Sequence, residues 1–430
     1  MDGDIFLIMG GRVVTPDGIA NSLVRIEGGR ITAVDADLPS DGAKIIDASG
    51  MLVAPGLVDL HCHLREPGYE EKEDIASGTA AAAKGGYASI CCMANTSPVN
   101  DNAVVTEFIK KKASLAGPVH VYPIAAITKN LAGEELTEAG ELAEAGAAAL
   151  SDDGKCVKNA HLMRLALSYA KRFGIRVISH PEDLDLTDGG LMNEGYWSTA
   201  IGLPGITRAA EDTMIARDCV LAETERAEVH IAHVSTAGGA EIIRQAKRRG
   251  VKVTCETAPH YIYATDELVS GYDTNTKVNP PLRAEDDRRA LIEALLDGTI
   301  DCIATDHAPH HIDDKNVEYA IAASGISGFE TAFSICWTVL VKGGYMTPEK
   351  LLEKMTSSPA KILGLDTGTI APGSPADIAI IDPDAEWTVD PDMFASRGHN
   401  TPFGGRTLSG VVKCTIAGGK IAFGNEWSCR

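Results

Sequence analysis

Two histidines separated by a single residue are the first sign of chemistry in this sequence. His61 and His63 alternate with apolar residues in the stretch VDLHCHLREPG, residues 58–68. Successive side chains of a strand point to opposite faces, so both imidazoles would point the same way at a strand end. Imidazole is the commonest protein ligand of metal ions, and the pair therefore suggests a metal site. One hydrogen-bonded core histidine and one surface histidine would give the same pattern, so further ligands must decide.

Alternating strand-like and helical segments must position these side chains. From about residue 52 to 345, short β-rich runs are separated by helical segments, the pattern of parallel strands joined by helices. Eight strands are expected, at residues 56–61, 88–94, 120–126, 147–152, 175–180, 229–234, 251–256 and 301–306. Helices are expected between them, among others at 79–86, 160–174, 210–224, 239–250 and 284–298. Eight such units predict an α/β fold, the (β/α)8 TIM-type barrel.

The two ends of the chain have a different pattern. Residues 12–37 and 374–424 are strand-like, punctuated by glycine, and lack long helical periods. Neither end is long enough to form a stable domain alone, so we expect the two ends to associate into one small β domain. The predicted division is residues 1–54 plus 366–430 for this composite domain and 55–365 for the metal-binding barrel.

Polar residues at the predicted strand ends would gather at one mouth of the barrel, where barrel enzymes carry their chemistry. They are His61 and His63 after the first strand, Asn95 after the second, Asp152 and Asp153 after the fourth, His180 ending the fifth, His233 near the end of the sixth, and Asp306 ending the eighth. Each alone would fit a core or loop residue, but their shared register favours a site. Six nitrogen and oxygen ligands exceed the need of one zinc ion, which predicts two metals bridged by a carboxylate and by water or hydroxide.

Composition excludes several classes of partner. The chain has 430 residues, 44% of them hydrophobic and 23% charged, and a formal net charge of -21. This charge argues against binding to nucleic acid, and no stretch approaches the roughly 18 apolar residues of a membrane span. The N-terminus lacks the basic region of a signal peptide, and the ten cysteines form no C-x-x-C pair. We expect a cytoplasmic protein with buried thiols and no membrane contact.

Longer motifs resemble the dihydroorotase family of the amidohydrolase superfamily. DLHCHLREPG (59–68) and ATDHAPHHIDDK (304–315) resemble its two signature stretches, and together they are highly specific. Four further stretches are also similar to that family, namely VNPPLR (278–283), HVSTAGG (233–239), SGFETAF (327–333) and GTIAPGSPADIAIID (368–382). The resemblance covers nearly the whole chain, although ASG at 323–325 replaces a Pro-Phe-Gly element in the loop after the eighth strand.

The resemblance implies a centre with two zinc ions (Zn2+). It places His61, His63 and Asp306 on one ion, His180 and His233 on the other, and Asp153 between them. Asp153 is preferred to Asp152 because it directly precedes Gly154, as the bridging aspartate does in members that lack a carboxylated lysine. Asp152 would then be a supporting or structural carboxylate.

The reaction implied by the resemblance is the reversible cyclisation of N-carbamoyl-L-aspartate to L-dihydroorotate and water in pyrimidine biosynthesis. In the hydrolytic direction, hydroxide attacks a ring amide carbonyl, and Asp306 takes the proton and delivers it to the leaving nitrogen. Arg65 is suited to bidentate capture of the substrate carboxylate, and Asn95 can donate to the same group. Asn279 and His310 complete the expected pocket.

Several alternatives stay open. For Arg65, the alternative is a surface ion pair with Glu66 or Glu70. For the whole chain, it is a related cyclic-amide hydrolase, an allantoinase or a dihydropyrimidinase (hydantoinase), which usually bridges its metals with a carboxylated lysine. The fourth strand end, LSDDGK, instead has Asp153, with Lys155 beyond the glycine. A non-catalytic scaffold for a carbamoyltransferase would lack ligands that are all present here. A second copy of the chain and a carbamoyltransferase are the two protein partners left open.

Overall fold

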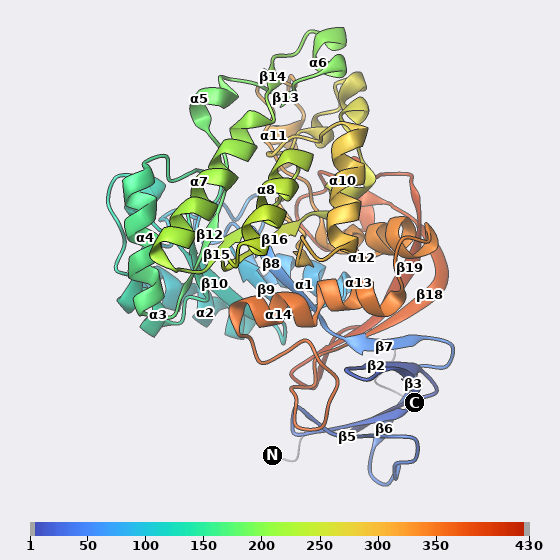
Figure 1. Ribbon diagram of the computed structural model, residues 1–430. Helices are drawn as coiled ribbons and strands as arrows, with labels where there is room; N and C mark the ends of the chain where they lie inside the picture. Colours follow the sequence, from blue (N-terminus) through green and yellow to red (C-terminus); the bar gives the residue numbers. More distant parts are fainter. Residues whose placement is uncertain (1–4, 425–430) are drawn as a thin grey trace.

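A (β/α)8 barrel forms the larger part of the molecule, as predicted (Figure 1). The computed structural model describes residues 5–424, so residues 1–4 and 425–430 of the predicted β domain, Cys429 among them, lie outside the described residues. Its eight parallel strands follow the order β17-β16-β15-β12-β11-β10-β9-β8. They are β8 (Leu57–Cys62), β9 (Tyr87–Cys92), β10 (His120–Ala125), β11 (Ala149–Ser151), β12 (Arg176–Ser179), β15 (Val229–Ile231), β16 (Val253–Thr257) and β17 (Cys302–Ile303).

The barrel closes beside the predicted metal pair. A parallel bridge joins Cys62 to His307, and the backbone N–H of His63 donates to the His307 carbonyl at 2.8 Å. The ladder between β8 and β9 shifts register between Asp59 and Cys62. Such irregularities re-aim side chains at barrel rims, and this one lies immediately before His63.

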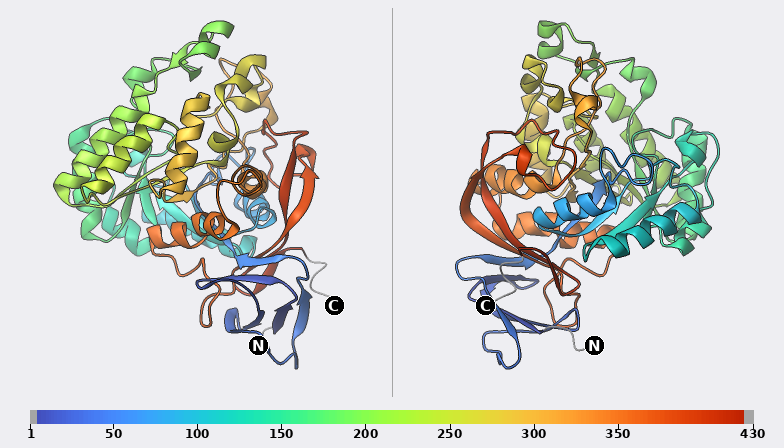
Figure 2. Two further views of the ribbon diagram at one scale, coloured as in Figure 1. Left: turned by 45° about the vertical axis from the view of Figure 1, so that its right-hand side comes forward. Right: turned by 180° about the vertical axis from the view of Figure 1, so that it is seen from behind.

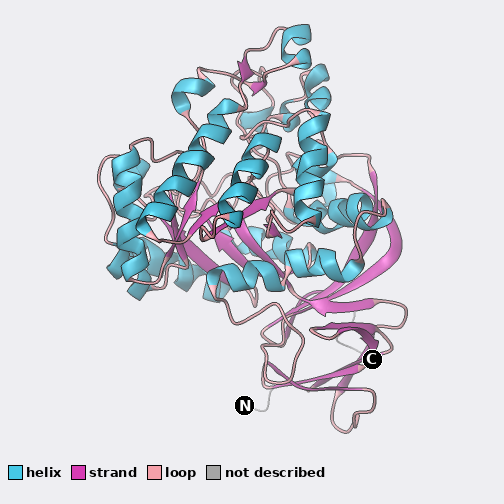
Figure 3. Cartoon of the chain, viewed as in Figure 1, coloured by secondary structure: helices cyan, strands magenta, loops and turns pink. Residues whose placement is uncertain are grey.

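Helices cover the outside of the barrel (Figure 3). One helix follows each strand: α1 (Ile75–Lys84), α2 (Ala103–Ala116), α3 (Ala139–Ala145), α4 (Ala160–Arg172), α7 (Ala209–Glu225), α8 (Ala237–Arg248), α10 (Glu285–Leu296) and α12 (Phe329–Cys336). All five predicted helices are present. The helix predicted at 79–86 begins four residues earlier, because the Asp74 side chain accepts the N–H of Ser77 and caps the first turn.

Shorter elements fill the loops and the bottom of the barrel. Those in the loops are α5 (Leu184–Thr187), β13 (Met192–Asn193), α6 (Tyr196–Ile201), β14 (Gly205–Ile206), α9 (Pro259–Tyr263) and α11 (Ile312–Lys315). Two helices follow α12, α13 (Pro348–Met355) and α14 (Ser357–Leu363). Ala360 and Ile362 of α14 belong to the apolar cluster that includes Leu60, Cys91 and Ile178 of the barrel strands. They close that core at the end opposite the strand-end histidines.

The chain ends form two further sheets. One has the order β5-β4-β1-β6 and the other β20-β19-β18-β7-β2-β3. The strands are β1 (Phe6–Met9), β2 (Arg12–Thr15), β3 (Gly18–Asn21), β4 (Leu23–Glu27), β5 (Arg30–Asp35), β6 (Lys44–Asp47), β7 (Leu52–Pro55), β18 (Ile378–Thr388), β19 (Thr407–Ala417) and β20 (Lys420–Phe423). Because β7 pairs with both β2 and β18, strands from the two ends share one sheet. One apolar cluster includes Phe6, Val24, Ile378 and Ile416.

The C-terminal segment extends from the second of these sheets onto the barrel. Strands β18 and β19 are each 11 residues long and extend along the side of the barrel (Figure 2). Phe394 and Phe403, which lie between them, belong to the same apolar core as Phe329 and Phe333 of α12. The division predicted at residues 365 and 366 stays a prediction, but residues 389–408 pack with the barrel.

Two expectations drawn from composition concern the thiols and the membrane. Nine cysteines lie within the described residues, and all nine are free and buried. Burial raises the pKa of thiols such as Cys91 and Cys302 well above the ordinary value, so these side chains are protonated core residues. No helix between residues 5 and 424 has the length and apolar character needed to cross a membrane.

Candidate metal centre and active site

Asp153 lies at the centre of four histidines at the C-terminal mouth of the barrel. Its Oδ1 is 3.3 Å from His61 Nε2, 3.3 Å from His180 Nδ1 and 3.4 Å from His233 Nε2. Its Oδ2 is 3.4 Å from His63 Nε2. All five side chains are buried. The structure therefore brings together four strand ends, β8, β11, β12 and β15, around one carboxylate.

Asp306 joins this group from the end of β17. Its Oδ1 lies 3.5 Å from His61 Nε2 and 3.4 Å from His63 Nε2. Burial alone would raise the pKa of Asp306, but the facing His61 and His63 lower it to about 2. The side chain is therefore an ionised carboxylate at neutral pH.

Asp152 points away from the centre. Its Oδ1 accepts the backbone N–H groups of Ile127 and Thr128 at 2.8 and 2.9 Å, and its Oδ2 accepts the Thr128 hydroxyl. These bonds hold the loop after β10. Asp153, and not Asp152, is the one that faces the histidines.

The donor set fits a pair of divalent cations. Two overlapping groups, His61 with His63 and Asp306, and His61 with Asp153 and His233, each have their ligand atoms within 4.8 Å of one another. Among the described residues, His61 Nε2 and Asp153 Oδ1 are buried without a hydrogen-bond partner. Buried polar atoms are nearly always satisfied, so orphans that face each other call for a shared ligand. Imidazole and carboxylate donors suit zinc.

Three of the four histidine rings are held from behind. The pairs are His61 Nδ1 with Glu256 Oε1 at 2.9 Å, His63 Nδ1 with Asn95 Oδ1 at 2.9 Å, and His180 Nε2 with Glu182 Oε2 at 3.0 Å. A partner on one ring nitrogen fixes the tautomer and leaves the other nitrogen as the ligand atom. In each case the remaining nitrogen faces Asp153.

Glu256 and Glu182 are functional residues that the sequence analysis did not assign. Glu256 ends the predicted seventh strand, and Glu182 lies two residues after His180. Their positions at or near predicted strand ends could have identified both residues as part of the site. Glu256 also receives His230 Nε2 at 3.1 Å. His230, Glu256 and Cys302 are close enough together to form a third possible ligand group. Because both histidines occupy the carboxylate and the thiol is protonated, we assign this group to the support of His61.

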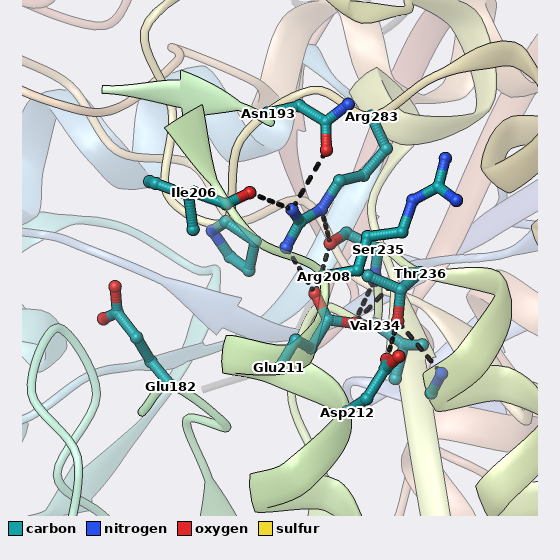
Figure 4. A network of polar contacts seen from close by, with 12 residues as sticks. Glu182, Asn193, Ile206, Arg208, Glu211, Asp212, Val234, Ser235, Thr236 and Arg283 are labelled. Carbon is teal, nitrogen blue, oxygen red and sulfur yellow. Dashed lines mark hydrogen bonds and ion pairs between the residues drawn. The ribbon is translucent and has the colours of Figure 1, made fainter. Parts of the chain in front are cut away.

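His233 is positioned through its backbone, by a network of Glu211, Ser235, Thr236 and Arg283 that Figure 4 shows. Its Nδ1 is buried and has no hydrogen-bond partner in the part of the chain that the structure describes, and its φ is 35°. Glu211 Oε1 accepts the N–H groups of Ser235 at 2.8 Å and Thr236 at 3.1 Å. Arg283 in turn donates to Ser235 Oγ at 3.0 Å and lies 3.3 Å from Glu211 Oε2. This buried network holds the turn that follows β15 and with it the left-handed backbone of His233, a conformation that costs free energy unless its surroundings impose it.

A cavity of about 420 Å³ opens beside the metal centre. Its walls include Asp153, Asp306 and all four predicted substrate-binding residues, Arg65, Asn95, Asn279 and His310. Asn279 Nδ2 donates to Glu182 Oε2 at 3.1 Å, which ties this wall to the support of His180. All four predicted substrate-binding residues and five of the six predicted metal ligands, all but His61, therefore line one cavity.

Arg65 turns into this cavity rather than toward its acidic neighbours in sequence. Glu66 pairs with Lys112 at 2.7 Å, and Glu70 accepts the N–H of Gly68 at 2.9 Å. Arg65 Nε instead donates to the Pro309 carbonyl at 3.2 Å. Burial lowers the pKa of Arg65 to about 10, so its guanidinium stays charged at neutral pH. These contacts argue against the surface ion pair considered for Arg65.

His310 lies directly beside Arg65. Its Nε2 is 2.9 Å from the Ser324 carbonyl and 3.4 Å from Arg65 Nη2. A ring nitrogen that donates to Ser324 cannot also accept from Arg65. The Nη2 group of Arg65 is therefore left to bind an anion in the cavity.

Comparison with known proteins agrees with this geometry. The amidohydrolase family model matches residues 203–423, and the dihydro-orotase-like model matches residues 50–238. The L-hydantoinase (dihydropyrimidinase) of Arthrobacter aurescens superposes with a TM-score of 0.87 at 26% identity, over 97% of this chain and 95% of that one. The dihydropyrimidinase of Brevibacillus agri, at 24% identity and a TM-score of 0.85, shares the fold. Fold and site define a cyclic amide hydrolase of the metal-dependent amidohydrolase family.

Closer relatives identify the branch of that family. The dihydroorotase of Geobacter metallireducens is 55% identical over 420 residues, which is 97% of this chain and 99% of the relative. That of Acetivibrio thermocellus is 54% identical over 417 residues, 96% of this chain and 98% of the relative. The chain belongs to the dihydroorotase family, as its motifs predicted. The much lower identity to the hydantoinases gives that alternative only weak support.

Proposed function

We propose that the cavity beside Asp153 interconverts N-carbamoyl-L-aspartate and L-dihydroorotate with the help of two zinc ions. The observation that carries the proposal is the charged Arg65 in the wall of a cavity shared with the histidine and aspartate cluster. L-Dihydroorotate differs from the neutral dihydrouracil by one ring carboxylate. A partly buried cation in the wall favours the substrate that can pair with it.

The proposed ligands divide into two sets around Asp153. His61, His63 and Asp306 would hold one zinc ion, His180 and His233 the other, and Asp153 both. When bound, zinc would supply a water molecule that ionises near neutral pH and a Lewis acid for the carbonyl oxygen. The described ligand atoms already face one another, so little reorganisation is needed for binding.

Asp306 is the proposed proton carrier. In the hydrolytic direction its carboxylate takes the proton of the attacking water and passes it to the ring nitrogen as the amide bond breaks. In the direction of cyclisation it takes the proton from the carbamoyl nitrogen and releases it with the departing water. His61 and His63 lower its pKa to about 2, so the side chain is a carboxylate before turnover and has a free position for the proton.

Substrate orientation is assigned to the cavity wall. Arg65 would bind the ring carboxylate with two parallel hydrogen bonds. Asn95 gives its oxygen to His63, so its amide N–H groups are the donors that the same carboxylate would meet. Asn279 and His310 complete the wall. In a chain of net charge -21, the partly buried arginine also offsets repulsion of a dianionic substrate.

The test is an assay of purified protein against L-dihydroorotate, dihydrouracil and allantoin, with metal analysis of the same sample. We expect turnover of dihydroorotate and N-carbamoyl-L-aspartate, about two zinc ions per chain, and loss of activity after exhaustive chelation. Equal turnover of dihydrouracil would instead favour the hydantoinase-like function. Association with a second copy or with a carbamoyltransferase stays a prediction.

A further inference from the structure

We propose that residues 396–400, SRGHN, act as a clasp that joins two loops of the cavity wall and sets where Arg65 and His310 lie. The first loop, residues 63–74, follows β8 and carries Arg65. The eighth loop, residues 304–328, follows β17 and carries His310. The inference rests on the proposed function, because these two side chains are the proposed carboxylate-binding pair.

Asn400 ties the clasp to the eighth loop with its entire side-chain amide. Its Oδ1 accepts the backbone N–H of His310 and the hydroxyl of Ser327, both at 2.9 Å. Its Nδ2 donates to the carbonyls of Ala308 at 3.1 Å and Gly325 at 2.9 Å. The side chain is buried. An asparagine amide can accept two and donate two hydrogen bonds, so its full capacity is spent on this one loop.

Gly398 brings the backbone of the clasp against the same loop. A Cβ at this position would lie 2.5 Å from Pro309 Cβ and 2.8 Å from the His310 nitrogen. The Gly398 carbonyl accepts the Ser327 hydroxyl at 2.6 Å. Pro309 is also the residue whose carbonyl accepts Arg65 Nε. The clasp therefore supports the peptide unit that lies between the two proposed substrate-binding side chains.

Glu73 ties the other end of the clasp to the first loop. This fully buried carboxylate accepts the Ser396 hydroxyl and, at 3.2 Å, the N–H of Arg397. Its Oε2 also lies 3.4 Å from His307 Nε2 in the eighth loop. The Arg397 guanidinium donates to the Glu70 carbonyl and pairs with the Asp74 carboxylate. Both loops are thus bonded to one short segment that lies outside the barrel strands.

The clasp should affect substrate binding more than metal binding. Four of the six proposed ligands lie outside the two loops that the clasp joins, and His63 and Asp306 come before Arg65 and His310 in those loops. The helix of the eighth loop, α11 (Ile312–Lys315), begins only after His310, so it does not hold His310 in place. A displacement of about 1 Å in a positioning group can cost about 100-fold in rate. Loosening the clasp should therefore raise KM while the zinc content stays the same.

The principal test is Asn400→Ala, with Asn316→Ala as the matched control. Asn316 is an exposed asparagine on the same loop. For Asn400→Ala we expect KM for dihydroorotate to rise about tenfold or more, kcat to fall less than about threefold, and zinc content to stay at the wild-type level. Amide hydrogen exchange at residues 308, 310 and 325–327 should become faster. Asn316→Ala should match wild type in all four measurements.

Two further variants guard against simple misfolding. Gly398→Ala adds one methyl group against Pro309 and should raise KM in the same way. Ser327→Ala removes a single hydroxyl shared by Gly398 and Asn400, and should raise KM about threefold in a fully folded protein. The proposal is wrong if these variants bind substrate within twofold of wild type, or if their defect lies in zinc content and kcat. Wild-type protein inactive on dihydroorotate would contradict the proposed function, and hydrogen exchange in the Ser327→Ala and Asn400→Ala proteins would still test the clasp.

Discussion

The two histidine pairs of the metal centre face the same carboxylate but are held differently. His61 and His63 leave one strand end, and each has a partner on its outer ring nitrogen, Glu256 for the first and Asn95 for the second. His180 and His233 leave separate strands. Glu182 holds the ring of His180, whereas the outer nitrogen of His233 is buried without a partner within residues 5–424.

This difference predicts unequal metal affinity on the two sides. Partners on ligand rings typically change metal affinity by about 10- to 100-fold, because they fix ring orientation and raise ligand basicity. The first side also has Asp306, a second carboxylate close to both rings. We therefore expect the zinc ion on the side of His180 and His233 to be the first one lost to a chelator.

The largest expected effect comes from removing what the two sides share. Asp153→Ala takes away the carboxylate that lies within 3.4 Å of all four histidines. We expect zinc content to fall further than in any single histidine variant and activity to fall by about 10³-fold or more. Elemental analysis and single-substrate kinetics measure both. Asp152→Ala is the control, and it should keep its zinc. Wild-type zinc content in Asp153→Ala would contradict the bridging role of this carboxylate.

Asp306→Asn changes only the zinc site of His61 and His63. It tests the two proposed roles of Asp306, metal ligand and proton carrier, separately. The amide keeps the shape and one ligating oxygen but cannot take a proton. We expect retained zinc with a rate loss of at least about 10². Parallel zinc analysis and initial rates in both directions provide the measurement. If the Asp306→Asn protein turns over substrate at the normal rate, another residue moves the proton, and His310 is the next candidate in the cavity.

Local sequence periodicity explains why the ligands His61 and His63 were easier to predict than the residues that support their rings. All eight predicted strands are present, and the proposed ligands follow them at the barrel mouth, because alternation and strand length are encoded locally. The partners of the rings are not local: Glu256 lies 195 residues from His61 in sequence. The same is true of Asn400, which lies within the strand-like C-terminal segment yet bonds to His310, 90 residues earlier. Such contacts depend on which side chains face each other after folding, and no sequence period reports that.

Arg65→Met leaves both metal sides intact and tests the substrate side of the cavity. Loss of a partly buried, charge-assisted pair should lower kcat/KM for dihydroorotate by about 10², with zinc content unchanged. Arg65→Lys should restore part of this loss, because a point charge cannot form two parallel hydrogen bonds. Lys112→Met, which removes the exposed partner of Glu66, is the control. A normal KM in Arg65→Met would move carboxylate recognition to another residue.

The smallest expected effect separates the two sides most directly. Glu256→Gln and Glu182→Gln make the same change, carboxylate to amide, behind one ring of each pair. Each should weaken zinc on its own side by about 10- to 100-fold, because the ring loses a charged hydrogen-bond partner. In a chelator titration with a zinc-sensitive dye, Glu182→Gln should lose the zinc ion beside His180 and His233 at a lower chelator concentration than wild type. The ion beside His61 and His63 should be lost at the same concentration as in wild type. Glu256→Gln should instead lose the zinc ion beside His61 and His63 at a lower chelator concentration than wild type. The two ions should then be lost at more similar chelator concentrations. Identical titration curves for the two variants would mean that the two pairs of histidines are not supported independently. The missing partner of His233 would then have no consequence for metal binding.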